Sequence, residues 1–139
     1  MIRVVTKATG EGKSQSLIAM ANENLKVTKG HVVFIDCDGS QMYELKHQIR
    51  YISTSDFPFD NHYEFFGFLC GILSRDSDIS DIYVDGLLKL ANLTAIDNPE
   101  KFAEKLKVLA EKFGINLTLG IGCSSDKLPA AFHEFGRAE

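Results

Sequence analysis

The chain has 139 residues, of which 45% are hydrophobic and 24% are charged. These proportions are those of an ordinary globular domain, and they exclude a disordered, fibrous or coiled-coil protein. Fifteen basic and nineteen acidic side chains give a formal net charge of −4, so no overall positive field attracts the chain to nucleic acid or anionic lipid.

The segment pattern predicts a single domain over residues 1–139, with a tail at 127–139. No apolar run reaches the length of about 18 residues that a membrane span requires, and the first residues lack a signal-peptide pattern. We therefore expect a cytoplasmic protein without membrane contact. Cys37, Cys70 and Cys123 are too far apart for a CxxC pair, which predicts buried thiols in a reducing compartment.

The first half of the chain alternates between strand and helix patterns. A strand is predicted at 2–5, followed by a glycine-containing break and a helix at 13–26 with apolar residues at helical spacing. The continuous apolar run at 31–35 predicts a strand that is buried on both faces. A short helix at 41–47 and a strand at 49–53 complete this half.

The second half continues the alternation. The segment 61–73 predicts a helix that is apolar all round, pressed against the sheet and with a possible second face against a partner. A strand follows at 81–85. The helix over 98–114 has a capping asparagine and a proline at its start and a glycine at its end. A last strand at 115–121 precedes the tail, whose apolar stretch is 128–135.

This alternation predicts an α/β fold, a three-layer sandwich with a mostly parallel five-stranded sheet. Ligands of such sheets bind beyond the carboxyl ends of the strands. Polar clusters follow four predicted strands, at 6–14, 36–40, 85–86 and 123–126. We expect these clusters to converge at one edge of the sheet.

The first polar cluster contains Thr-Gly-Glu-Gly-Lys-Ser at 9–14, between a predicted strand and a predicted helix. Glycines let backbone N–H groups face a phosphate, and the helix N-terminus adds partial positive charge. A lysine then reaches the terminal phosphates and a serine hydroxyl completes a magnesium shell. A dinucleotide-binding loop is a weaker interpretation, because Gln15 occupies the position of its third glycine.

The loop resembles the Walker A motif of P-loop NTPases, with Lys7 in place of the first glycine. The resemblance implies ATP and Mg²⁺ as ligands, with Ser14 at the metal. It implies nucleotide contacts from Lys7, Thr9, Gly10, Glu11, Gly12, Lys13, Ser14 and Gln15.

The strand Ile-Tyr-Val-Asp at 82–85 resembles the Walker B strand, whose terminal aspartate holds magnesium. This resemblance gives Asp85 the role of metal ligand. Gly86 follows directly, so the acidic pair that many ATPases carry here is absent, and a catalytic base must come from elsewhere. The alternative role for Asp85 is that of a loop-capping aspartate.

Residues 35–38, Ile-Asp-Cys-Asp, resemble the segment of RecA-like ATPases that ends in a catalytic glutamate. Asp38 then occupies the position of the base. Since aspartate is one methylene shorter than glutamate, slow or absent hydrolysis is expected. The alternative is a turn at Asp38-Gly39 without catalytic function.

The RecA-like resemblance extends over residues 4–126. It implies a sensor function for Ser124 and Ser125 after the last strand, where hydrogen bonding detects the γ-phosphate. It also implies the strand order 1-5-4-2-3, which leaves the first strand as an open edge. Because proteins normally cover such edges, we expect the apolar tail at 128–135 or a second subunit to cover it.

MinD/ParA-type ATPases are the second family that the chain resembles. Residues 35–41, Ile-Asp-Cys-Asp-Gly-Ser-Gln, are similar to their Ile-Asp-x-Asp-Pro-Gln pattern, and Lys7 is offset by one position from their additional loop lysine. In that family the lysine reaches across a nucleotide-bound dimer. The position of Lys7 would therefore distinguish the two resemblances.

Three functional hypotheses follow. The first is an ATP- and Mg²⁺-binding NTPase with slow hydrolysis coupled to assembly, as a homo-oligomer or with a protein partner. The second is a nucleotide-sensing interaction module without hydrolysis, and the third is an α/β scaffold that binds no nucleotide. A nucleic-acid partner follows from family resemblance alone. The four histidines lack helical metal-pair spacing, and no Gly-x-Ser-x-Gly elbow indicates a hydrolase.

Overall fold

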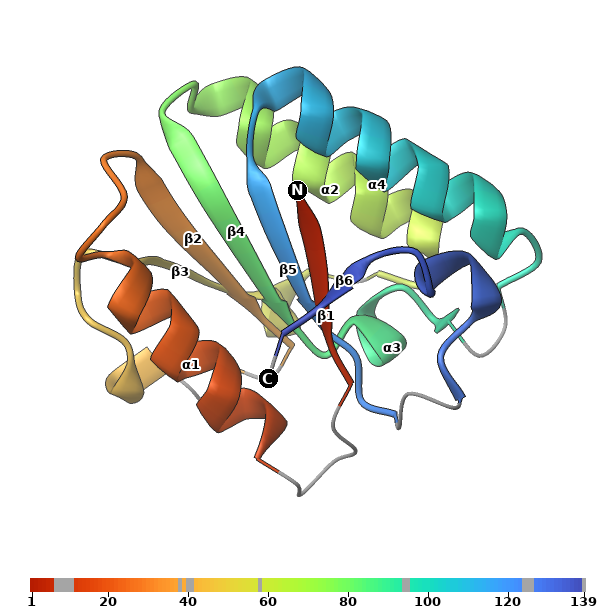
Figure 1. The fold of residues 1–139 in the computed structure, drawn as a ribbon, viewed down its shortest axis with the longest axis horizontal. Coiled ribbons are helices and arrows are strands. Elements are labelled where there is room, and N and C mark those ends of the chain that lie inside the picture. The colour runs from red at the N-terminus through yellow and green to blue at the C-terminus, as the bar shows by residue number, and fades with distance from the viewer. Residues whose placement is uncertain are drawn as a thin grey trace.

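A computed structural model describes residues 1–6, 12–37, 39, 42–57, 59–93, 96–123 and 127–138, with the backbone alone at positions 13 and 42 (Figure 1). The strands are β1 (Ile2–Val5), β2 (His31–Asp36), β3 (Arg50–Ser53), β4 (Ile79–Asp85), β5 (Asn116–Gly120) and β6 (Gly136–Arg137). The helices are α1 (Lys13–Asn24), α2 (His62–Arg75), α3 (Leu87–Leu90) and α4 (Pro99–Phe113), with short 3-10 turns at Met42–Glu44, Thr54–Asp56 and Ala130–Phe132.

The strands form one sheet in the order β3-β2-β4-β5-β1-β6, and all five pairings are parallel. The predicted α/β class, parallel sheet and order 1-5-4-2-3 are confirmed. The predicted number of five strands is wrong, because β6 adds a sixth strand beside β1. The chain therefore covers the edge that the sequence leaves open.

β6 lies just beyond the apolar stretch that was expected to cover β1. Gly136 and Arg137 pair with Arg3 and Val4, and the Ala138 N–H donates to the Val4 carbonyl at 2.9 Å. The preceding apolar residues Leu128, Phe132 and Phe135 are buried in the core. The tail thus anchors through its side chains and covers the edge through its backbone.

The helices lie on opposite faces of the sheet: α1 covers one face, and α2 and α4 lie side by side over the other (Figure 1). The side chains of β2 divide accordingly. Val33 and Ile35 belong to the core cluster of α2 and α4, whereas Val32 and Phe34 belong to the cluster of α1. This alternation explains the uninterrupted apolar run of β2, since both faces of the strand are buried.

The boundaries of α4 follow from its terminal residues. The Asn98 side chain accepts a hydrogen bond from the Lys101 N–H at 3.1 Å, Pro99 begins the helix, and Gly114 ends it with a φ of 63°. These features satisfy helix-end groups that would otherwise lack partners. The predicted helix is confirmed.

Two local predictions are wrong. The expected helix at 41–47 is reduced to the 3-10 turn Met42–Glu44, because so short a segment does not offset the cost of helix nucleation. The helix α3, which follows Gly86, was not predicted. The expectation of buried thiols also needs correction, since Cys37, Cys70 and Cys123 are only partly buried. Among the described helices, none is both long and apolar enough to cross a bilayer.

Candidate functional site at the carboxyl ends of the strands

The last residues of five strands form a row along one edge of the sheet. Pairing places Ser53, Asp36, Asp85, Gly120 and Val5 in register, in that order, at the ends of β3, β2, β4, β5 and β1. We call these five residues the carboxyl-end row. Its second and third members are the carboxylates Asp36 and Asp85, which are buried, with 1% and 3% of their surface exposed.

Ser14 connects the start of α1 to the carboxyl-end row. Its hydroxyl donates a hydrogen bond of 2.7 Å to Asp85 Oδ2. β1, which leads into α1, is separated from β4 by β5, so this contact passes over the end of an intervening strand. The predicted convergence of the first and third polar clusters is confirmed for this pair.

Gly120 allows α1 to approach the sheet at this point. A Cβ at this position would lie 2.4 Å from Leu17 Cδ1 and 3.1 Å from the Val84 carbonyl oxygen. Leu17 is fully buried and lies one turn after Ser14, so a side chain at 120 would force Leu17 to move. The glycine therefore leaves room for Leu17 of α1 at the end of β5.

Asp36 is held by residues of the strand that follows it. Tyr51 Oη donates to Asp36 Oδ2 at 2.7 Å, and Thr54 Oγ1 donates to the Asp36 carbonyl at 3.3 Å. The Tyr51 ring stacks on Phe34, with 6.4 Å between ring centroids. Because buried carboxylates require hydrogen-bond donors, these contacts fix the orientation of Asp36 beside Asp85.

The position after Asp85 has no room for a side chain. Gly86 has a φ of 93°, and a Cβ there would lie 2.9 Å from Cys37 Sγ. Both the backbone conformation and the thiol disfavour a side chain at 86. Glycine is therefore the residue that this position accommodates without strain.

The structure describes some of the predicted site residues and not others. Gly12 caps α1 in the left-handed conformation with a φ of 85°, which favours glycine, and the backbone of Lys13 begins the helix. Gln15 is exposed in the first turn. The following predicted residues lie outside the described part of the chain: Lys7, Thr9, Gly10, Glu11, Asp38, Ser124 and Ser125.

Sequence reasoning missed two features of this edge. It chose Asp38 over Asp36, although Asp36 directly ends an apolar run in the same way as Asp85 does. It also missed Tyr51 as the donor, because only the pairing of β2 with β3 places the two side chains together. The signal that could have found Asp36 is the shared position of both aspartates at strand ends.

The chemistry of Ser14 and Asp85 suits a hard divalent cation. Mg²⁺ prefers oxygen ligands and is usually bound by one or two carboxylates together with substrate phosphates. A hydroxyl and a carboxylate in direct contact, beside a helix N-terminus, offer such oxygens where phosphates would lie. These residues therefore fit a magnesium–phosphate group.

A second group of polar side chains lies at the opposite end of the strands. His31, Asp76 and Asp78 bring potential ligand atoms within 4.8 Å of one another, but Arg50 forms an ion pair with the same Asp76 carboxylate. Desolvation raises the pKa of Asp76, whereas hydrogen bonds from His31 and the Asp78 backbone and the charges of His31 and Arg50 lower it. The net pKa of Asp76 lies below 3.8. This cluster is a structural ion-pair network.

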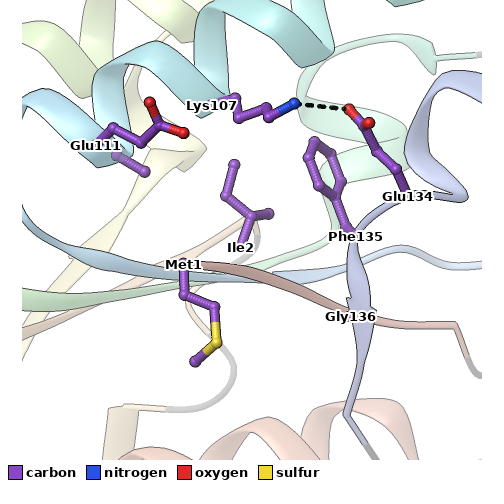
Figure 2. Close-up of a pocket in the computed structure, with 8 residues that line it drawn as sticks. Met1, Ile2, Lys107, Glu111, Glu134, Phe135 and Gly136 are labelled. Carbon is purple, nitrogen blue, oxygen red and sulfur yellow. Dashed lines mark ion pairs between the residues drawn. The ribbon is translucent and has the colours of Figure 1, made fainter.

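A cavity of about 330 Å³ lies beside the start of β1 (Figure 2). Met1 and Ile2 line it with residues of α4 and the tail, and an ion pair of 3.5 Å joins Lys107 to Glu134. A strand rises about 3.3 Å per residue, so this cavity is roughly 10 Å from the carboxyl-end row. It is separate from the candidate site.

Comparison with protein-family models and with curated proteins gave no match for this chain. The candidate site is therefore argued from its own geometry.

Proposed function

We propose that this chain is a nucleotide-binding domain that holds the phosphates of ATP together with Mg²⁺, in the manner of a RecA-like P-loop NTPase. The observation that carries the proposal is the hydrogen bond of 2.7 Å between Ser14 and Asp85. In the P-loop NTPases that the chain resembles, the residues at these two positions bind the same magnesium ion. A direct contact between them is what such a site requires before metal and nucleotide bind.

Three further features support this proposal. The glycine that caps α1 and the first turn of that helix lie where phosphates would meet backbone N–H groups. The strand order agrees with the RecA-like resemblance, since β1 lies beside β5. A second buried carboxylate, Asp36, lies in register with Asp85 on the neighbouring strand.

Each residue then has a defined role. The Lys13 ammonium would neutralise the terminal phosphates, and the Ser14 hydroxyl and Asp85 carboxylate would hold the metal. Asp38 is the proposed base, and Ser124 and Ser125 are the proposed sensors of the γ-phosphate. A three-layer P-loop architecture, in which α1 covers one face and α2 and α4 the other, belongs to this proposal.

The test is equilibrium binding of ATP with and without Mg²⁺. Lys13→Ala should weaken binding about 10- to 100-fold, since a hydrogen bond to a charged group contributes roughly 1.5 to 3 kcal/mol. Lys29→Ala, an exposed lysine after α1, is the matched control and should bind normally. Absent ATP binding, or equal affinity in both variants, would reject the proposal.

A non-hydrolysing nucleotide sensor is the second candidate, and Gly86 favours it. Its φ of 93° and the Cys37 thiol disfavour a side chain directly after Asp85, and the glycine there supplies no carboxylate as a catalytic base. Phosphate release under conditions of saturating Mg²⁺–ATP distinguishes the two. Binding without release would favour the sensor, and steady release would favour the ATPase.

A further inference from the structure

A groove of about 590 Å³ lies on the outer surface between α2 and α4, which we call the α2–α4 groove. Each helix lies between two parallel strands in the chain, α2 between β3 and β4 and α4 between β4 and β5, so both run in the same direction, side by side (Figure 1). The lining residues are Phe66 and Cys70 of α2 and Lys101, Glu104, Lys105, Val108, Leu109, Lys112 and Phe113 of α4. The groove therefore combines an apolar floor with charged walls.

Large apolar side chains remain exposed along this groove. Val108 and Phe113 of α4, which both line it, have 52% and 45% of their surface exposed. On an amphipathic surface helix these outward positions are ordinarily polar. A contiguous exposed apolar surface of this kind indicates an interaction site.

Lysines dominate the charged walls. Lys101, Lys105 and Lys112 line the groove with a single acid, Glu104. Lys105 Nζ lies 5.2 Å from the centre of the Phe66 ring, which is within cation–π range and keeps the ammonium over the apolar floor. Within the described part of the chain, no carboxylate forms an ion pair with these three lysines.

This local charge opposes the charge of the whole chain, which is −4. Two copies joined through the same groove would bring lysines against lysines, and like charges across an interface disfavour that pairing. The complementary partner carries acidic groups around an apolar surface. The lysines therefore favour binding of a different, acidic protein over symmetric pairing of two copies of this chain.

Two glycines of α2 each follow a groove residue in the chain, Gly67 after Phe66 and Gly71 after Cys70. A Cβ at Gly67 or Gly71 would meet no other described atom within 4 Å, and both residues are exposed. Glycine inside a helix is unfavourable relative to alanine, and no contact in the described part of the chain explains either one. Their spacing of four residues places both on one exposed face of α2, where the backbone of a partner can approach the helix closely.

We propose that the α2–α4 groove binds an amphipathic helix of another protein, with an apolar face flanked by aspartate and glutamate. A groove between two parallel helices accepts a third helix through apolar anchors at positions i, i+4 and i+7. A lipid surface fits less well, because the apolar residues line a concave groove between lysine-bearing walls. This proposal does not depend on nucleotide binding.

The test uses the full chain and a displayed library of helical peptides. Leucines are fixed at i, i+4 and i+7, and the flanking positions are randomised among acidic, basic and serine residues. Three exposed ion pairs correspond to about a tenfold preference, so acidic flanks should be enriched to that extent. Absence of enrichment, or equal enrichment of basic flanks, would overturn the proposal.

Variants then locate the binding of the best peptide. Val108→Glu should abolish it, whereas Val27→Glu, at an exposed valine after α1, should leave it unchanged. Replacing all three groove lysines by glutamate should invert the preference toward basic flanks. Thermal unfolding of every variant identifies those that fail to fold.

Gly71→Ala separates binding from folding. Because alanine favours the helix, this variant should melt at a higher temperature than the original chain and yet bind the peptide more weakly. Unchanged peptide affinity in this more stable variant would overturn the role of the glycines. The K101E/K105E/K112E variant should still fold and bind the basic-flanked peptide.

Two further outcomes would replace the proposal. Binding of the chain to phosphatidylserine vesicles, lost in the triple lysine variant, would indicate a lipid surface. A dimer in sedimentation velocity that dissociates on Val108→Glu would indicate a second copy of this chain.

Discussion

The Ser14 hydroxyl and the Asp85 carboxylate are 71 positions apart in sequence and 2.7 Å apart in space. Ser14 follows β1, Asp85 ends β4, and β5 lies between these strands. Gly120, at the end of β5, leaves room for Leu17 of α1, one turn after Ser14. A small residue in the intervening strand thus lies under the helix whose first turn carries one of the two polar groups.

Ser14→Ala should weaken the Mg²⁺-dependent part of ATP binding about 10- to 100-fold, the usual effect of losing a group that holds or orients a metal ligand. Ser14→Thr keeps the hydroxyl and is the control. Isothermal titration with Mg²⁺ and with EDTA measures the difference. If the alanine variant loses affinity equally in both conditions, Ser14 does not act through the metal.

Tyr51→Phe should lower the free energy of unfolding by about 1 to 3 kcal/mol, because the Asp36 carboxylate loses a donor while it stays buried. Tyr43→Phe is the matched control, since Tyr43 is 91% exposed. Urea denaturation of both variants measures the effect. Equal stability of the two would show that Tyr51 does not support Asp36.

The sequence predicts that Ser14 and Asp85 lie near each other, because each belongs to a local pattern: a Gly-Lys-Ser turn before a helix, and an apolar strand that ends in an acid. It does not predict how Asp36 is held, since its donor Tyr51 lies on the next strand. It also does not predict β6, whose two residues Gly136 and Arg137 have no strand preference of their own. Gly136 and Arg137 form a strand because the open edge of β1 supplies backbone hydrogen-bond partners.

Gly120→Ala should lower the free energy of unfolding by about 1 to 3 kcal/mol through overpacking against Leu17. Leu17→Ala alone should cost about 2 to 5 kcal/mol. The double variant should lose less than both changes together, since the smaller side chain makes room for the new methyl group. A double-mutant cycle measures this coupling, and strictly additive losses would contradict the contact.

The ionised Asp76 carboxylate should stabilise the folded state at pH values above its ordinary pKa, and this stabilisation should disappear in acid. Its folded pKa is lowered below 3.8, so the folded state favours the ionised carboxylate. The contribution is complete above pH 3.8 and disappears as the pH falls through the folded pKa. The stability difference between the original chain and Asp76→Asn should therefore be larger at pH 7 than at pH 3.

Chemical denaturation at both pH values measures this difference, with Asp60→Asn as a control at an exposed position. Arg50 is cationic at both pH values, so its ion pair is lost through protonation of Asp76 itself. A difference that grows toward pH 3 would contradict the lowered pKa.

Removal of residues 136–139 should expose the edge of β1. The chain would lose the pairing of Gly136 and Arg137 with Arg3 and Val4, together with the hydrogen bond from Ala138 to Val4. Backbone hydrogen bonds contribute roughly 1 kcal/mol each, so we expect a loss of about 1 to 3 kcal/mol. An unpaired edge strand also recruits other chains, so the truncated protein should associate as its concentration rises.

Sedimentation velocity over a concentration series measures the association, and thermal unfolding measures the stability. Arg137→Ala is the control, because it keeps the backbone pairs and removes only the side chain. A truncated chain that stays monomeric and as stable as the control would show that β6 is not what protects β1. In that case Leu128, Phe132 and Phe135, buried before β6, would hold the tail without its strand.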